Sequence, residues 1–289
     1  MPELPEVETV KRGLEPVLKG RKIERVEIRR SGLRFPFPKG FAELLEGATV
    51  QNLSRRAKYI VMDLDNGFSL IVHLGMTGRF TVLSPKGVSN LGAFYFEAES
   101  GEGADGRHDH VVLHLQLGMR LVYSDPRRFG MMDAVETSEL SQHRLLKDIG
   151  VEPLGNELSA IYLVQKFKGK TAPMKAALLD QRIIAGLGNI YVCEALFRAR
   201  ISPTRKAGRV KVEKLEELVH HIRAILNEAI LAGGSTLQDF KSTNGAQGSY
   251  QQRFLVYDRE GEPCSSCSKP IRRLVQSGRS SFYCGSCQR

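Results

Sequence analysis

The stretches CSSC at residues 264–267 and CGSC at residues 284–287 determine the structure expected at the C-terminal end of this chain. Two CxxC pairs with 16 residues between them supply four thiolates, and each pair grips one metal ion from a tight turn. Two disulfides are the alternative, which an intracellular chain disfavours. We expect one structural Zn²⁺ held by Cys264, Cys267, Cys284 and Cys287. The fifth cysteine, Cys193, lies in an apolar helical stretch and is expected to be a small buried residue.

The positive charge of the chain is concentrated in the half that carries this zinc module. The formal net charge is +10, with 21 basic and 20 acidic residues up to residue 150 but 21 and 12 after it. A basic half favours a polyanionic partner, because neutralised phosphates release counterions. A basic protein without such a partner is the alternative. No apolar run spans a bilayer and the acidic N-terminus is unlike a signal peptide, so we expect a cytoplasmic protein with no membrane partner.

The first half of the sequence favours short β-strands separated by turns such as Asp65-Asn66-Gly67. Such strands are typical of an antiparallel sandwich or barrel. One amphipathic helix is expected before them, at residues 6–18, and residues 100–108 are expected to form a flexible loop. The expected strands are residues 21–30, 49–53, 59–65, 68–73, 92–97, 111–116 and 119–123.

The second half favours helices, and the chain therefore combines a β domain with a helical one. Helices are expected at residues 138–149, 159–167, 173–179, 189–198 and 213–231, the last with one apolar face and Gly233-Gly234 at its end. Residues 235–252 are rich in Gly, Ser, Asn and Gln and are expected to form a mobile loop. This α+β division places a β domain at 1–135, a hinge at 136–155, a helical domain at 156–252 and the zinc module at 253–289.

The N-terminus MPELPEVETV carries an unusual nucleophile if Met1 is removed. Pro2 then has a free secondary amine whose pKa is about 7.7–8.0, compared with about 10.4 for a lysine, so far more of it is neutral at pH 7. Such an amine forms an iminium ion with a sugar aldehyde. Glu3 and Glu6 lie beside it and are candidates for proton transfer. An ordinary acidic helix start is the alternative.

Four further motifs place polar residues in turns. RRAKY at 55–59 leads Lys58 into a strand, HLGMTG at 73–78 holds His73 and Met76, and DPRRFG at 125–130 pairs Arg127 with an aromatic residue. An arginine and an apolar wedge are what a protein needs to fill the gap left by an everted base. GLGN at 186–189 opens a helix whose N-terminus can hold a phosphate. Each motif alone is compatible with a surface or structural role.

The motifs together indicate a family. MPELPEVET, RRAKY, HLGMTG, DPRRFG, GLGNIY and the CxxC-x16-CxxC pattern follow one another over about residues 2–288. This order resembles formamidopyrimidine-DNA glycosylase, the bacterial enzyme that removes 8-oxoguanine and ring-opened purines. The resemblance implies an antiparallel β-sandwich domain, a helix-two-turn-helix domain centred near residues 174–199 and a zinc finger hairpin. It also implies a monomeric, nucleoid-associated glycosylase/AP lyase of base excision repair that binds damaged double-stranded DNA.

The resemblance implies the catalytic roles as well. Pro2 is expected to attack C1′ of the damaged nucleotide and displace the base through a Schiff base, after which β,δ-elimination cuts the strand. Glu3 is expected to protonate the sugar ring oxygen, and Glu6 to support the site. Lys58 is expected to donate a proton during elimination and to contact a phosphate.

The resemblance assigns DNA contacts to six further residues. Those expected to fill the gap left by the flipped nucleotide are Met76, Arg127 and Phe129, with Arg127 on the orphaned cytosine. Those expected to grip phosphates are His73, Asn189 and Arg279, with Arg279 also assisting elimination. The zinc module positions Arg279, and the 235–252 loop corresponds to a segment that closes over the flipped base.

Two other functions remain compatible with the sequence. The related endonuclease VIII type prefers oxidised pyrimidines and shares the proline mechanism, but its members typically begin PEGPE, whereas this chain has Leu4. A non-catalytic zinc-containing DNA-binding protein fits the charge and the cysteines. The set of Pro2, Glu3 and Lys58 disfavours it, because a pure binding module has no use for them.

Overall fold

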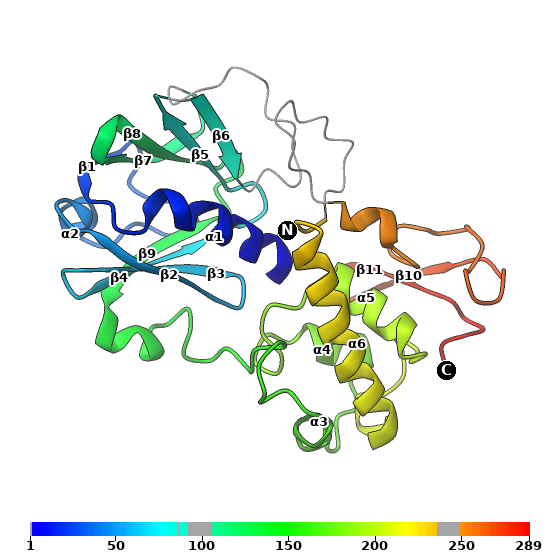
Figure 1. Ribbon diagram of the computed structural model, residues 1–289. Coiled ribbons are helices and arrows are strands. Elements are labelled where there is room, and N and C mark those ends of the chain that lie inside the picture. The colour runs from blue at the N-terminus through cyan, green and yellow to red at the C-terminus, as the bar shows by residue number, and fades with distance from the viewer. Residues whose placement is uncertain (1, 86, 92–105, 236–248) are drawn as a thin grey trace. The chain divides into compact units, whose positions relative to one another are not determined.

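The computed structural model describes residues 2–85, 87–91, 106–235 and 249–289. The chain divides into two compact units (Figure 1). Unit 1 comprises Met1–Lys147 with Gly233–Gly248, and unit 2 comprises Asp148–Ala232 with Ser249–Arg289. The four-part domain division expected from the sequence stays a prediction. Among the described residues, no helix is long and apolar enough to span a membrane.

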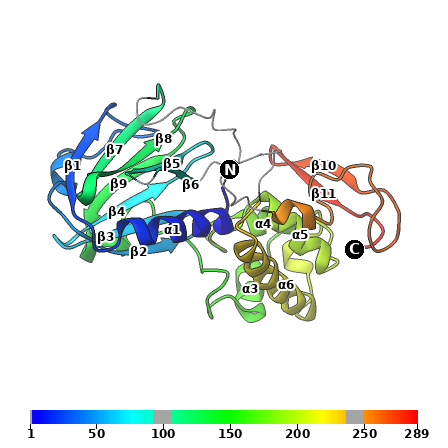
Figure 2. The same cartoon turned by 45° about the horizontal axis from the view of Figure 1, so that its top comes forward.

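Unit 1 is built from two antiparallel sheets, which confirms the expected sandwich (Figure 2). One sheet has the order β1-β7-β8-β5-β6 and the other has the order β2-β3-β4-β9. The strands of the first are β1 (Ile23–Ile28), β7 (Asp109–Leu115), β8 (Met119–Ser124), β5 (Arg79–Ser84) and β6 (Gly87–Leu91). Those of the second are β2 (Val50–Arg56), β3 (Tyr59–Leu64), β4 (Phe68–His73) and β9 (Met131–Glu136).

Helix α1 (Leu4–Leu18) packs on this sandwich and completes its core. It begins two residues earlier than expected, because Pro5 occupies the first turn, where a missing N–H costs no intrahelical bond. Its buried face joins side chains of both sheets and of the short helix α2 (Phe41–Leu45) in one hydrophobic cluster. The α1 residues of that cluster are Val7, Val10, Leu14 and Leu18.

Several sequence expectations for unit 1 need correction. Strands β5, β6 and β9 were not expected, and the helix expected at 138–149 is wrong: a 3-10 helix, η2 (Thr137–Gln142), is followed by turns. Asp133 on β9 explains the difference, because it binds His143 at 3.2 Å and Arg144 at 2.8 Å and holds the chain against the strand. The strand expected at 92–97 and most of the 100–108 and 235–252 loops lie outside the described residues.

Unit 2 contains the four helices that the sequence predicts: α3 (Ala160–Phe167), α4 (Met174–Leu179), α5 (Asn189–Arg198) and α6 (Val212–Leu231). A turn at residues 181–183 and a bend at 185–186 join α4 to α5, as the expected helix-two-turn-helix requires. The apolar face of α6 packs on α5 and α3.

The C-terminal hairpin of β10 (Arg272–Gln276) and β11 (Arg279–Tyr283) also belongs to unit 2. Cys193 on α5 is 2% exposed and lies in one hydrophobic cluster with Cys264 and Cys284, as a small buried residue should.

Candidate active site and metal centre

The N-terminal segment of unit 1 is anchored by a buried capping box. Glu3 is the N-cap of α1, and the Glu6 carboxylate accepts the Glu3 backbone N–H at 2.9 Å while the Glu3 side chain accepts from the Glu6 backbone. The other Glu6 oxygen accepts the backbone N–H and the hydroxyl of Ser235 at 2.8 and 3.0 Å. Glu3 is 3% exposed, Glu6 is 0% exposed and Pro2 is buried. These bonds hold the backbone at Glu3, next to Pro2, against the first turn of α1.

Lys58 is held in the turn between β2 and β3. The preceding Ala57 has φ +54°, and Lys58 is only 5% exposed. Arg55 ties this turn to α1, because its guanidinium donates to Glu8 at 3.0 Å and to the Ala57 carbonyl at 2.9 Å. Although partial burial opposes it, bonds from Arg12 and Arg55 hold the pKa of the Glu8 carboxyl below its usual value. The ion pair between Arg55 and Glu8 therefore connects the turn that carries Lys58 to helix α1.

His73 ends β4 as a neutral imidazole. The backbone N–H of Gly75 donates to His73 Nδ1 at 3.0 Å, so Nδ1 accepts and the ring proton is on Nε2. Burial, then the charges of Lys58 and Arg34, lower the pKa of His73 to about 4. A neutral N–H donor beside two cations is suited to an anionic oxygen.

Two turns of unit 1 carry the remaining three candidates. Met76 is half-buried in the 73–78 turn, while Arg127 and Phe129 are exposed in the 125–130 turn. The Arg127 guanidinium lies 4.7 Å from the centre of the Phe129 ring, and Phe129 is 44% exposed. An exposed aromatic ring with an arginine stacked on it presents a flat apolar surface and a set of hydrogen-bond donors together.

Asn189 and Arg279 meet at the zinc hairpin of unit 2. The hairpin turn, Ser277-Gly278, has φ +49° and +73°, the conformation of a two-residue type I′ turn, and leaves Arg279 exposed. Asn189, the first residue of α5, donates one amide N–H to the Ser280 carbonyl at 3.0 Å. The side-chain nitrogen of an asparagine has a second N–H.

Lys175 is a residue of this region that sequence reasoning missed. It is 1% exposed, and its ammonium group donates to the Ser280 carbonyl and the Ser281 hydroxyl, both at 2.7 Å. It therefore holds the strand that presents Arg279. The sequence does not reveal that Lys175 is buried, because lysines are usually exposed and Lys175 lies on a short helix, α4.

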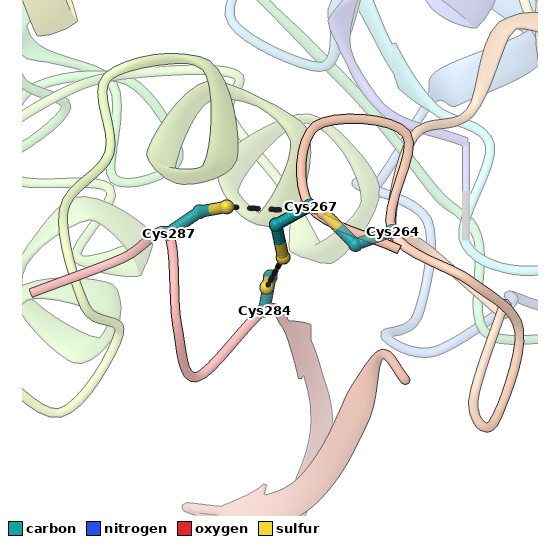
Figure 3. Close-up of side chains that lie close together, drawn as sticks. All are labelled: Cys264, Cys267, Cys284 and Cys287. Atoms are coloured by element: carbon teal, nitrogen blue, oxygen red, sulfur yellow. Dashed lines mark hydrogen bonds between the residues drawn. The ribbon is translucent and has the colours of Figure 1, made fainter. Parts of the chain in front are cut away.

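The four clustered cysteines form a metal site (Figure 3). Their sulfur atoms all lie within 4.8 Å of one another, with Cys264 and Cys287 at 3.9 Å and Cys267 and Cys284 at 3.5 Å. Zn–S bonds of 2.3 Å in a tetrahedron require sulfurs about 3.8 Å apart, so the set fits zinc. The four cysteines of the cluster form no disulfide with one another, which excludes the disulfide alternative in this structure.

The predicted site residues thus fall into two groups. Unit 1 holds Pro2, Glu3, Glu6, Lys58, His73, Met76, Arg127 and Phe129, whereas unit 2 holds Asn189, Arg279 and the four zinc ligands. Besides Lys175, nothing in the sequence indicates that Thr77 and Ser235 are buried and bond to Arg127 and Glu6 of the first group. The same holds for buried Asp125, which bonds to Thr77. Asp125 is inside a quoted motif, but its burial could not be recognised there.

Three family descriptions match the chain in succession: the formamidopyrimidine-DNA glycosylase N-terminal domain at residues 1–132, the formamidopyrimidine-DNA glycosylase H2TH domain at 149–241 and the zinc finger found in FPG and IleRS at 261–289. A sandwich with a basic helix-two-turn-helix unit and a four-cysteine zinc site is, with these matches, a zinc-containing DNA glycosylase of base excision repair. It holds one structural Zn²⁺.

Curated relatives and solved structures are similar to this chain over its full length. The chain is 54% identical to the formamidopyrimidine-DNA glycosylase of Dinoroseobacter shibae and 53% identical to that of a Ruegeria species, in both cases over 100% of each chain. It belongs to the formamidopyrimidine-DNA glycosylase family, whose members combine glycosylase with AP lyase activity.

Two solved structures illustrate the likeness. MutM (Fpg) from Thermus thermophilus is 37% identical with a TM-score of 0.83, covering 99% of this chain and 98% of that one. A Lactococcus lactis Fpg mutant bound to a Fapy-dG containing DNA is 32% identical with a TM-score of 0.87 and 100% coverage of both.

Proposed function

We propose that this enzyme excises oxidised purines, 8-oxoguanine and formamidopyrimidines, from double-stranded DNA and then cuts the strand by β,δ-elimination. The observation that carries the proposal is the buried capping box that fixes Pro2 and Glu3 at the start of α1. The Lactococcus lactis relatives bound to Fapy-dG and abasic-site DNA support the substrate class. The enzyme acts as a monomer in the cytoplasm, on the nucleoid.

The chemistry begins at the Pro2 nitrogen once Met1 has been removed. Its lone pair attacks C1′ of the damaged nucleotide, and the C1′–N bond breaks with its electron pair leaving on the base. The departing base takes up the N–H proton of the Pro2 nitrogen, which restores the lone pair that opens the sugar ring. Glu3 protonates the sugar ring oxygen as the ring opens, which leaves an iminium between Pro2 and C1′.

Strand cleavage follows from the acidity of C2′ beside the iminium. Loss of a C2′ proton expels the 3′ phosphate, and a second elimination expels the 5′ phosphate, so a one-nucleotide gap remains. Lys58 is the proton donor for elimination and Glu6 supports the site, while Arg279 assists from its phosphate contact. His73 and Asn189 donate to phosphates, and the half-exposed Phe129 with Met76 and Arg127 fills the gap in the duplex.

Borohydride trapping tests this proposal. Protein with a processed N-terminus is mixed with duplexes carrying 8-oxoguanine opposite cytosine, and reduction should give a covalent complex and a δ-elimination product. Protein with an uncleaved N-terminal extension is the matched control and should give neither, because the Pro2 nitrogen is then an amide. Faster cleavage of thymine glycol would favour the endonuclease VIII type, and binding without a trapped complex would favour a non-catalytic protein.

A further inference from the structure

One buried carboxylate joins the two turns that carry Met76, Arg127 and Phe129. Asp125 is 0% exposed, and one of its oxygens accepts the hydroxyl proton of Thr77 while the other accepts the backbone N–H of Gly130 at 2.7 Å. Thr77 belongs to the 73–78 turn and Gly130 ends the 125–130 turn. The charge-assisted bonds to Asp125 therefore couple the two turns directly.

Thr77 extends this connection to the backbone of Arg127. Because its hydroxyl proton is donated to Asp125, its oxygen has lone pairs left, and one accepts the Arg127 backbone N–H at 3.2 Å. The carbonyl of Asp125 accepts the Arg128 N–H at 3.1 Å and bonds to His110 Nε2 at 2.8 Å. The backbone N–H groups of Arg127 and Arg128 are thus both held by buried residues, Thr77 and Asp125.

Tyr123 and three glycines bring the turns into close contact. A methyl group on Gly78 or on Gly130 would overlap the Tyr123 hydroxyl, and one on Gly75 would overlap the backbone at Phe129 and Gly130. Burial, then the neighbouring Asp125 carboxylate, raise the pKa of Tyr123 well above its ordinary value, so this hydroxyl stays protonated. Sheet pairing holds both turns at their ends, at His73–Met131 and Arg79–Ser124. Between those ends, the hydrogen bonds of Asp125 and Thr77 join the two turns.

We infer that Asp125 and Thr77 are positioning residues that hold Met76, Arg127 and Phe129 in register as one gap-filling set, and so determine how strictly the enzyme reads the base opposite the lesion. The inference rests on the gap-filling role in the proposed function. Hydrogen bonds to a base edge weaken steeply with small displacements of the donor. Loosening the two turns therefore affects reading of the opposite base more than attack on an open abasic site.

Variants of Thr77 isolate the effect with little change of shape. Thr77→Val matches the volume but leaves the Asp125 oxygen and the Arg127 N–H without their partner. Thr77→Ser keeps the hydroxyl and should therefore retain the wild-type preference for the opposite base. Asp125→Asn keeps the size but replaces one acceptor with a donor. Asp133→Asn is the matched control, because Asp133 is a buried carboxylate of the same unit, 8% exposed, that bonds to His143 and Arg144 and not to Thr77 or Gly130.

The experiment compares single-turnover excision of 8-oxoguanine opposite cytosine with excision opposite adenine, and also cleavage of an abasic site opposite cytosine. We expect Thr77→Val and Asp125→Asn to lower the cytosine-to-adenine ratio about tenfold, the size expected for loss of one base-edge contact. Abasic-site cleavage should change less than about threefold, and Thr77→Ser and Asp133→Asn should behave like the wild type.

Arg127→Ala separates failure of this inference from failure of the proposed function. If Arg127→Ala lowers the ratio and the Thr77 and Asp125 variants leave it unchanged, the positioning role is wrong and the gap-filling role stands. If Arg127→Ala also leaves it unchanged, both are wrong. Equal losses on all three substrates in Thr77→Val, with no rescue by serine, would show a purely structural effect and overturn the inference.

Discussion

Replacing Glu6 by glutamine tests the role of the buried capping box most sharply. The Glu6 carboxylate accepts one bond from the Glu3 N–H, at 2.9 Å, and two from Ser235, at 2.8 and 3.0 Å. A glutamine has one oxygen in place of two, so it can accept either from Glu3 or from Ser235 but not from both. Its best orientation keeps the two bonds to Ser235 and turns the NH₂ group towards the Glu3 N–H, so two donors meet in a buried place.

The cost can be worked from these contacts. Losing one buried bond and leaving a backbone N–H unsatisfied costs about 1–3 kcal/mol. Removing a negative charge from the first turn of a helix adds about 0.3–1 kcal/mol. We therefore expect Glu6→Gln to lower the free energy of unfolding by about 1–4 kcal/mol. The rate of borohydride trapping should fall as well, because the Glu3 backbone that positions Pro2 is released.

Urea denaturation and single-turnover trapping measure the two effects. Glu15→Gln is the matched control on the same helix, because Glu15 pairs with Lys11 at 3.0 Å on a partly exposed surface. That change should cost no more than about 0.5 kcal/mol and leave trapping unaffected. A Glu6→Gln protein within about 0.5 kcal/mol of the wild type, trapping at the wild-type rate, would refute the reasoning.

Three further predictions concern other parts of the molecule. Cys264→Ser, or chelation of the zinc, should weaken DNA binding by releasing the hairpin that presents Arg279; unchanged affinity in metal-free protein contradicts this. Lys175→Met should lower DNA affinity while zinc content is retained, and a normal dissociation constant would exclude a role in holding that hairpin. His73 has a folded pKa of about 4, against about 6.5 when unfolded, so the unfolded state takes up the proton first as the pH falls. Stability should therefore fall below pH 6.5, by about 2–3 kcal/mol at pH 4.5, and His73→Asn should remove that part of the pH dependence; identical pH profiles of urea unfolding would contradict it.

Much of the fold could be predicted because its periodic patterns are strong. The apolar faces of α1 and α6 and the apolar runs of β3 and β4 are local features. Strand β9 (Met131–Glu136) was missed because polar Asp133 is buried in it and interrupts a short apolar run. The helix expected at 138–149 failed for a related reason, since Asp133 bonds to residues that follow the strand.

The site shows the same division between local and distant information. The zinc ligands were predictable because spacing within two short motifs decides them. The contacts of Asp125 were not, because its partner Thr77 lies 48 residues away and a charged residue beside a proline is usually exposed. Ser235 is 229 residues from the Glu6 carboxylate that it binds. Such polar contacts depend on the completed fold.

Peptide mapping of the borohydride-trapped complex tests the central claim most directly. After digestion of protein and DNA, mass spectrometry should find the sugar remnant on the N-terminal peptide, with Pro2 as its first residue and Met1 absent. A remnant on Lys58, or on any other lysine, would contradict the assignment of Pro2 as the nucleophile.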